Sequence, residues 1–375
     1  MLSPEECKSS AGSESTARPL HAGGDREETH KMNITVLAGL ESENAGSYDP
    51  VVDQVASALR ENGHQVSIFA VYKSVTDLVE GLTSRKPDLV FNLLESFGED
   101  LGGDVAVAGL LNLVGVRYTG GGPGELYLRQ DKALAKKALA FDSIPYPHYA
   151  VFSQDADLET FGQLRMPLFV KPLTADASIG IDGDSLVRDA TSLMRRVLDI
   201  HEKVKDSALV EEYIEGRELY VGVLGNREPI ALPPIEVDFS GLPEGMPRVL
   251  GTKAKWVPES AEYKGTKSVL ADLPDELRAR LQKTAVDAAR ALRVRDYGRV
   301  DLRLTETGDI YVIEVNANCY LEKESEFAVS AKAHGLEFPE LIQRIVDLAM
   351  ERYAVNGQPA EQLKENEEAP AAVHS

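Results

Sequence analysis

The chain has 375 residues, more than one small hydrophobic core needs, and its length predicts two or three domains. Asp and Glu outnumber Lys and Arg by 61 to 40, and this net charge of −21 argues against a nucleic-acid groove as the main function. The longest apolar run, Val105–Val116, contains Gly109 and Asn112 and is too short to span a membrane. Only Cys7 and Cys319 are present, which excludes a disulfide framework or a Cys-rich zinc site. With a polar, acidic N-terminus in place of a secretory leader, these features predict a cytoplasmic protein with no membrane partner.

Both ends of the chain have low apolar content. Residues 1–31 show no apolar periodicity and are predicted to be a disordered leader. Because Met32 directly precedes a strand-like run, a native start at Met32 is an alternative. Residues 355–375 are predicted to be a disordered tail.

Strand-like and helix-like segments alternate in the first folded part, 32–124. The expected strands are 33–37, 65–71, 88–94 and 116–119, and the expected helices are 51–62, 75–84 and 106–114. This alternation predicts a parallel sheet with helices on both faces, an α/β arrangement. The glycine-rich run Gly120–Gly124 predicts a boundary between domains.

Two further domains are predicted, 125–214 and 215–354, of α/β or α+β type. In the first, Asp131 is expected to cap a helix over 132–141, followed by strands 149–152 and 168–171, helix 190–204 and strand 208–214. The second is expected to contain strand 218–224, a Pro/Gly-rich stretch 229–266, helix 275–292, strands 297–304 and 310–316, and helices 325–334 and 340–353.

The two adjacent strands 297–304 and 310–316 predict a hairpin. If residues 307–308 form a two-residue turn, Asp301 lies opposite Glu314 and Arg299 lies opposite Asn316, all on one face. Two carboxylates and an amide are hard oxygen ligands that suit Mg²⁺ or Mn²⁺ bridging phosphates. A solvated face with cross-strand ion pairs is the alternative. The opposite face is apolar and is expected in the core, with Val300, Leu302, Leu304, Ile313 and Val315.

A second group of residues suggests a nucleotide site. Lys171 ends an apolar strand and precedes a loop of small residues, Thr174–Gly180, in which backbone N–H groups could approach a phosphate. The segment Glu211–Ile214 is extended and could pair with an adenine edge, and Glu218 could accept from ribose hydroxyls. The alternative for these glutamates is an ordinary surface position.

Together these motifs resemble the ATP-grasp superfamily and, within it, the D-alanine–D-alanine ligase family. The resemblance covers most of 32–353 and includes the segments Asp131–Lys132, Ala254–Trp256 and Ser325–Ile342. It implies a three-domain ATP-grasp architecture with an N-terminal parallel-sheet (pre-ATP-grasp) domain.

The resemblance also implies a role for each matching residue. Lys132, Lys171 and Ser178 would contact ATP phosphates, and Lys255 would lie on a mobile loop, within 251–265, that closes over the γ-phosphate. The backbone of Glu212 and Ile214 and the side chain of Glu211 would contact adenine, Glu218 would bind ribose, and Asp301, Glu314 and Asn316 would bind two Mg²⁺ ions. Arg299 would stabilise charge at the acyl carbon, and Ser325 would contact the second substrate's carboxylate.

The implied activity is ATP-dependent formation of an amide bond between amino-acid substrates through an acyl phosphate. The family further suggests a homodimer. No histidine is assigned a role, and Cys319 is interpreted as a small filler, with a reactive thiol as the alternative.

The chain departs from the family pattern at the substrate end. The ligases have a serine in the phosphate loop and a tyrosine partner on the mobile loop, and this chain has Ala177 and Trp256 at those positions. The ligases have Ser-Pro-Gly after the metal-binding asparagine, and this chain has Asn318–Tyr320. The His-Gly segment of the ligases is replaced by Leu94–Asp100. Because such a site discriminates strongly against analogues, these changes predict a D-alanine–D-alanine ligase-like enzyme with a changed amino-acid substrate. The alternatives are a true D-alanine–D-alanine ligase, another ATP-grasp enzyme, such as a glutathione-synthetase-like or carboxylase-type one, and a non-catalytic ATP-binding sensor.

Overall fold

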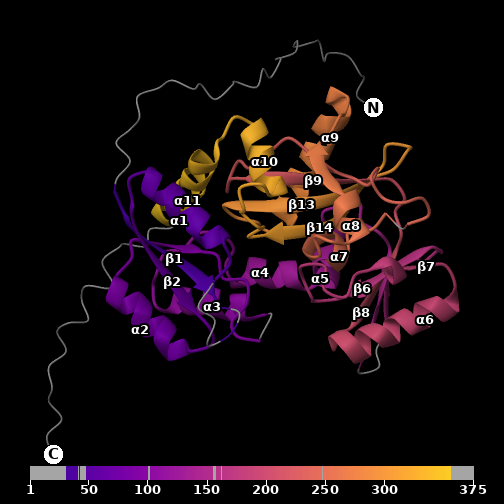
Figure 1. The fold of residues 1–375 in the computed structure, drawn as a ribbon, viewed down its shortest axis with the longest axis horizontal. Coiled ribbons are helices and arrows are strands. Elements are labelled where there is room, and N and C mark those ends of the chain that lie inside the picture. Colours follow the sequence, from indigo (N-terminus) through magenta and orange to yellow (C-terminus); the bar gives the residue numbers. More distant parts are fainter. Residues whose placement is uncertain are drawn as a thin grey trace, which may run out of the picture. The chain divides into compact units, whose positions relative to one another are not determined.

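The computed structural model describes residues 31–40, 42, 48–99, 102–154, 158–161, 163–246 and 248–355. The predicted leader and tail lie almost entirely outside these residues. The described part contains three sheets, each with its own covering helices (Figure 1). In that part, no helix is both long and apolar enough to cross a membrane.

The N-terminal sheet is parallel, as its βαβ pattern predicts. Its strands lie in the order β2-β1-β3, with bounds β1 (Asn33–Gly39), β2 (Gln65–Val71) and β3 (Leu89–Asn92). Helix α1 (Val51–Glu61) covers one face, and α2 (Val75–Arg85) and α3 (Gly103–Leu113) cover the other. The fourth strand expected at 116–119 is reduced to a single bridge between Val90 and Tyr118.

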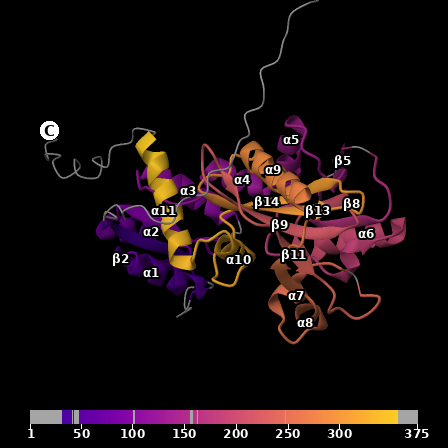
Figure 2. The same ribbon diagram turned by 90° about the horizontal axis from the view of Figure 1, so that it is seen from above.

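The second sheet is antiparallel, in the order β5-β4-β8-β6-β7. Its bounds are β4 (Tyr149–Phe152), β5 (Leu158–Phe161), β6 (Leu168–Pro172), β7 (Leu186–Val187) and β8 (Ala208–Glu212). Helix α6 (Ala190–Asp199), continued by a π-helical turn (Ile200–Val204), packs against this sheet (Figure 2). The 3-10 turn Gly183–Ser185 precedes β7. Helix α5 (Lys132–Phe141) begins at Asp131, whose side chain caps it as predicted.

The third sheet carries the predicted hairpin. Its order is β12-β11-β9-β13-β14, with β10 paired to β9, and its bounds are β9 (Arg217–Leu224), β10 (Ile230–Ala231), β11 (Ile235–Asp238), β12 (Lys267–Leu270), β13 (Tyr297–Leu304) and β14 (Ile310–Ala317). Helix α9 (Asp275–Ala291) covers one face. The short helices α7 (Thr252–Trp256) and α8 (Ala261–Gly265), like β10 and β11, fall in the stretch 229–266, where Pro and Gly obscure the periodicity.

The glycine-rich run Gly120–Gly124, the predicted domain boundary, is part of the packed structure. Gly120 has a φ of +85°, and a Cβ there would lie 2.1 Å from Asn318 Oδ1. Gly122 directly precedes helix α4 (Pro123–Gln130), which the sequence analysis missed, and Pro123 occupies its first turn. This run therefore brings the start of α4 against the end of β14.

The C-terminal helices link the third sheet to the first domain. Helix α10 (Glu326–Ala333) packs on β9, and α11 (Phe338–Val355) lies beside α1 (Figure 1). One apolar core contains side chains of both α1 and α11, including Val55, Leu59, Ile342 and Val346. Apolar periodicity predicted both helices. It could not predict that α11 packs against α1, because α1 is far away in sequence.

Candidate active site

The hairpin of β13 and β14 places four polar side chains together. Asp301 pairs with Glu314 and Arg299 with Asn316, as predicted. The Arg299 guanidinium donates to both Asp301 oxygens, at 2.7 and 3.0 Å, and Asn316 Nδ2 donates to Asp301 Oδ2 at 3.2 Å. Asp301 and Asn316 are buried, so this is not the solvated strand face that was the alternative.

The turn of this hairpin differs from the prediction. Thr305 N donates to Asp309 O, which encloses the three residues 306–308 instead of a two-residue turn and shifts the register by one. A β-bulge opposite Asp301 and Leu302 shifts the register back. The predicted pairs form because the two shifts cancel. Val312 therefore occupies the core position expected for Ile313, which lines a cleft.

The Arg299 side chain is held between two carboxylates and an aromatic ring. Its Nη1 lies 3.6 Å from Glu326 Oε2, and its guanidinium lies 4.6 Å from the centre of the Tyr220 ring. Although burial opposes the charge, Asp301 and Glu326 hold the pKa of Arg299 well above its usual value. Burial raises the pKa of Asp301 to about 6 despite the opposing charge of Arg299. Arg299 therefore stays cationic.

Next to the hairpin lies a buried cluster of two lysines and one glutamate. Lys171, at the end of β6, lies 3.0 Å from Glu211 Oε2, and Lys136 on α5 lies 2.6 Å from Glu211 Oε1. Burial alone would raise the pKa of Glu211, but the charges of the two lysines hold it below its usual value. Both oxygens of Glu211 thus face lysines, and the expected contact of this side chain with adenine stays a prediction.

Lys132 connects the same cluster to the hairpin. Its Nζ donates to Ala175 O at 2.8 Å and lies 3.6 Å from Glu314 Oε1. Lys132 and Lys136 are separated by one turn of α5, so both side chains project from one face of the helix. Two cations therefore reach the cleft from α5.

The small-residue loop after β6 is tightly constrained. Asp206 Oδ2 accepts hydrogen bonds from the backbone N–H groups of Thr174 and Ala175, at 2.7 and 3.0 Å. Ala177 and Ser178 both have positive φ, 53° and 60°, a conformation that costs free energy for residues other than glycine. The rest of the structure therefore imposes the shape of this loop.

The segment 250–256 lies against this loop. Thr252 Oγ1 donates to Ser178 O at 2.6 Å, and Ser178 Oγ donates to Leu250 O at 3.2 Å. The indole N–H of Trp256 donates to Ala177 O at 3.1 Å. Although the chain lacks the family's serine and tyrosine here, a side-chain to backbone bond joins the two segments.

A cleft lies between the second and third sheets and is lined by residues of both. Nine of the predicted site residues line it: Lys171, Ser178, Glu211, Glu212, Ile214, Glu218, Lys255, Asp301 and Glu314. Lys132, Asn316 and Arg299 contact members of this set. Ser325 does not line the cleft, and its hydroxyl caps α10.

At one end of the cleft, hydrogen bonds and ion pairs hold the side chains of Glu218 and Glu212. Glu218 Oε2 accepts from Arg303 at 2.6 Å and Glu218 Oε1 accepts from the Tyr220 hydroxyl at 2.8 Å. The Glu212 side chain contacts Arg165 N and His148.

Arg303 was not predicted from the sequence, although its strand spacing from Arg299 and Asp301 places it on the same face of the strand. Lys136 was missed as well, and its spacing from Lys132 was the available signal.

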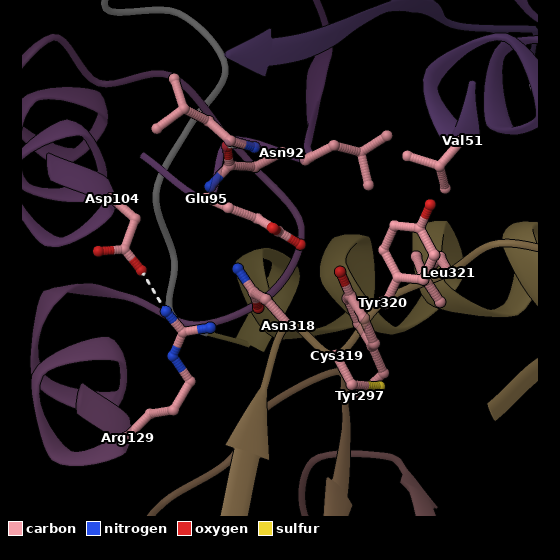
Figure 3. A pocket seen from close by; sticks show the side chains of 12 residues that line it. Val51, Asn92, Glu95, Asp104, Arg129, Tyr297, Asn318, Cys319, Tyr320 and Leu321 are labelled. Carbon is pink, nitrogen blue, oxygen red and sulfur yellow. Dashed lines mark hydrogen bonds and ion pairs between the residues drawn. The ribbon is translucent and has the colours of Figure 1, made fainter. Parts of the chain in front are cut away.

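A second pocket lies at the carboxyl end of β3, where ligands bind in open α/β sheets (Figure 3). Its lining includes Asn92, Glu95 and Arg129 on one side and the segment 318–321 on the other. Burial raises the pKa of the Cys319 thiol to about 12, so it stays protonated and unreactive at neutral pH, consistent with a filler.

The three sheets and the cleft define an ATP-grasp enzyme. The family model "D-ala D-ala ligase C-terminus" matches residues 139–347, more than half of the chain. A D-alanine–D-alanine ligase of Desulforudis audaxviator is 33% identical over 80% of this chain and 92% of that protein, and an uncharacterized protein of Sinorhizobium fredii, y4sG, is 33% identical over 82% and 89%. The crystal structure of an ATP-complexed D-alanine–D-alanine ligase from Bacillus anthracis has a TM-score of 0.70 at 24% identity, covering 87% of this chain and 100% of that one.

The chain therefore belongs to the D-alanine–D-alanine ligase family, as its motifs predicted, and is an ATP-dependent carbon–nitrogen ligase. The alternative of a non-catalytic sensor is not better supported than the ligase.

Proposed function

We propose that this enzyme activates the carboxylate of one amino acid with ATP and joins it to the amine of a second, and that at least one of the two differs from D-alanine. One observation carries this proposal: three lysines, Arg299 and the hairpin carboxylates converge on a single cleft. Phosphoryl transfer requires mainly such positioning and positive charge.

In the first step, an oxygen of the donor carboxylate attacks the γ-phosphorus of ATP, and ADP leaves. Lys132, Lys171 and Lys255 would hold the phosphates, with Glu211 fixing Lys171 in place. Adenine would lie along the backbone of 212–214, and the ribose hydroxyls would donate to Glu218, whose carboxylate Arg303 and Tyr220 orient. Ser178 would contribute to the phosphate side of the cleft.

The hairpin residues suit a divalent cation. Among the described residues, no cluster of three His, Cys, Asp or Glu side chains has metal-binding geometry. Asp301, Glu314 and Asn316 nevertheless supply hard oxygen atoms on adjacent strands, and phosphate oxygens and water would complete the coordination. Bound Mg²⁺ would neutralise charge on the β- and γ-phosphates.

In the second step, the amine nitrogen attacks the acyl carbon, the tetrahedral oxyanion collapses, and phosphate leaves as the amide forms. Arg299 would stabilise the oxyanion because Asp301, which lines the cleft, and Glu326 hold its guanidinium in place. Ser325 would act on the second substrate only indirectly, through the start of α10. Segment 250–256 would exclude water, which hydrolyses acyl phosphates.

The residues at the substrate-binding end of the site differ from the family pattern, and this supports a change of substrate. Ala177 lacks the hydroxyl of the family's serine, and the Trp256 indole contacts the Ala177 backbone instead. The segment 318–320 has Asn318 at a φ of 54° in place of the family's Ser-Pro-Gly turn. The cytoplasmic location, which composition predicts, and the homodimer, which the family suggests, stay predictions.

The test is ADP release by the purified protein with Mg²⁺ and ATP against a panel of D- and L-amino acids, singly and in pairs, with products identified by mass spectrometry. We expect turnover with at least one amino acid other than D-alanine. Turnover with D-alanine alone would contradict the changed substrate and identify a true D-alanine–D-alanine ligase. Tight ATP binding with no turnover on any amino acid would contradict the ligase function.

A further inference from the structure

A buried tyrosine lies between two groups of functional residues on the third sheet. Tyr220 on β9 is 3% exposed, and the strand register places it opposite Asp301 on β13. The same register places Glu218 opposite Arg303. Because side chains two residues apart on a strand share a face, Tyr220 lies on the face that carries both Glu218 and Asp301.

The hydroxyl of Tyr220 binds Glu218. It donates to Glu218 Oε1 at 2.8 Å, while Arg303 donates to Glu218 Oε2 at 2.6 Å. Burial, together with the charges of Glu218 and Asp301, raises the pKa of Tyr220 well above its usual value, so the phenol keeps its proton and stays a donor. An ionised carboxylate has about four acceptor positions, so Glu218 can also accept from ribose hydroxyls.

The ring of Tyr220 contacts Arg299. The guanidinium lies over the ring, 4.6 Å from its centre, which is within the ~6 Å range of a cation–π contact. Asp301 accepts two hydrogen bonds from the same guanidinium. The ring therefore supplies a second kind of contact, to an aromatic face, that fixes where the guanidinium lies.

The two ends of Tyr220 move together. No rotatable bond between heavy atoms separates the hydroxyl oxygen from the ring, so a shift of the hydroxyl shifts the ring as well. The ring belongs to a small apolar core with Ile235 and Val237, and Leu250, which lines the cleft, packs against this core. The position of Glu218 is thus linked to that of Arg299 through one rigid side chain.

We propose that Tyr220 is a positioning residue that couples the ribose subsite to Arg299. In this assignment, which rests on the proposed ligase function, ribose hydroxyls hold Glu218, Glu218 holds the Tyr220 hydroxyl, and the ring holds the guanidinium at the acyl carbon. Part of the binding energy of the ribose would therefore act in the transition state, away from the reacting atoms. A nucleotide that lacks a ribose hydroxyl would then turn over more slowly even when it saturates the enzyme.

The experiment measures kcat and the nucleotide KM with ATP, 2′-deoxy-ATP and 3′-deoxy-ATP, at saturating concentrations of amino acids on which the wild type turns over. In the wild type, we expect kcat to fall about 3- to 10-fold with the deoxynucleotide that loses the Glu218 contact. Tyr220→Phe keeps the ring and removes the hydroxyl, so its kcat should agree within about twofold among the three nucleotides. Tyr220→Leu also removes the ring, and its kcat with ATP should lie at least about fivefold below that of Tyr220→Phe.

The matched controls are Tyr118→Phe and Tyr118→Leu in the first domain. Tyr118 is also buried, its hydroxyl donates to Asn112 Oδ1 at 2.9 Å, and the Arg295 guanidinium lies 5.4 Å from its ring centre. Both controls should keep the wild-type ratios of kcat among the three nucleotides. Circular dichroism shows whether each variant is folded, and Tyr220→Phe keeps the test decisive if Tyr220→Leu is not.

Three results would overturn the inference while leaving the ligase function intact. The first is a wild-type kcat that is the same with all three nucleotides, and the second is a deoxynucleotide effect on kcat that is as large in Tyr220→Phe as in the wild type. The third is an equal kcat in folded Tyr220→Phe and Tyr220→Leu. Failure of the wild type to turn over any amino acid would instead contradict the proposed function, and with it this inference.

Discussion

Asp301 shows how single side chains set the chemistry of the cleft. Its two oxygens accept three hydrogen bonds, two from Arg299 and one from Asn316, and it lies opposite Glu314. The carboxylate is thus held in one orientation by its neighbours. The same contact holds Arg299, so in the proposed mechanism one residue would position both a metal ligand set and an oxyanion-stabilising charge.

Asp301→Asn should therefore separate ATP binding from turnover. We expect Mg²⁺-dependent ADP release to fall at least about 100-fold, because a charged ligand and the partner of Arg299 are lost together. ATP binding, measured by calorimetry, should persist with the lysines unchanged. Glu306→Gln, in the exposed turn of the same hairpin, is the control and should keep full activity. Normal turnover by Asp301→Asn would contradict the metal-site proposal.

At the scale of elements, hydrogen bonds join the small-residue loop after β6 to the segment 250–256, and in the proposed mechanism this contact would couple the nucleotide and substrate sites. Five hydrogen bonds join 177–181 to 250–256, and a Cβ on Gly251 would lie 2.6 Å from Ile181 O. The close approach thus needs a glycine. Trp256 is more than half exposed, so its ring contributes little to the core and its N–H bond is its main contact.

Trp256→Phe keeps an aromatic ring and removes the N–H donor. A hydrogen bond of this kind contributes about 1 kcal/mol, so we expect the two segments to separate more often and admit water. The ratio of ADP released to amide formed should rise about two- to tenfold, with little change in melting temperature. Tyr263→Phe, on the neighbouring α8, is the control. An unchanged ratio would show that the Trp256 contact does not limit water access.

Sequence patterns predicted the helices and strands better than the turns and bulges that connect them. The helix over 132–141, its Asp131 cap and the hairpin pairs are all present, because local periodicity and capping chemistry determine them. The bulge at Ile313 could not be predicted, because it compensates for the three-residue turn, and these residues are as compatible with a three-residue turn as with a two-residue turn. Only the match of the apolar face to its neighbouring strand and helix selects the register.

At the scale of the whole described molecule, a buried ion pair joins the last helix to the first domain and the third sheet. Arg352 on α11 donates to both oxygens of Asp296, at 3.1 and 2.8 Å, and also to Tyr118 O. Asp296 is fully buried and accepts from Gly120 N at 2.8 Å. Three segments distant in sequence thus meet at one carboxylate.

Arg352→Met should destabilise the protein by about 3–5 kcal/mol, because it leaves Asp296 as a buried charge without its cation. Arg344→Met is the matched control on the same helix: its ion pair with Glu351 is largely exposed and contributes about 0–1 kcal/mol. Chemical denaturation of both variants tests this. Equal stability of the two would show that Asp296 finds another partner.

The sequence by itself determined the family, the order of the elements and most of the residues that line the cleft, because local periodicity, caps and strand alternation are written in neighbouring residues. The tertiary structure decided which charges are paired. Glu211 binds two lysines, and Asp296 binds an arginine from the last helix. These differences depend on contacts between segments far apart in the chain, where packing and solvent exclusion set the electrostatics.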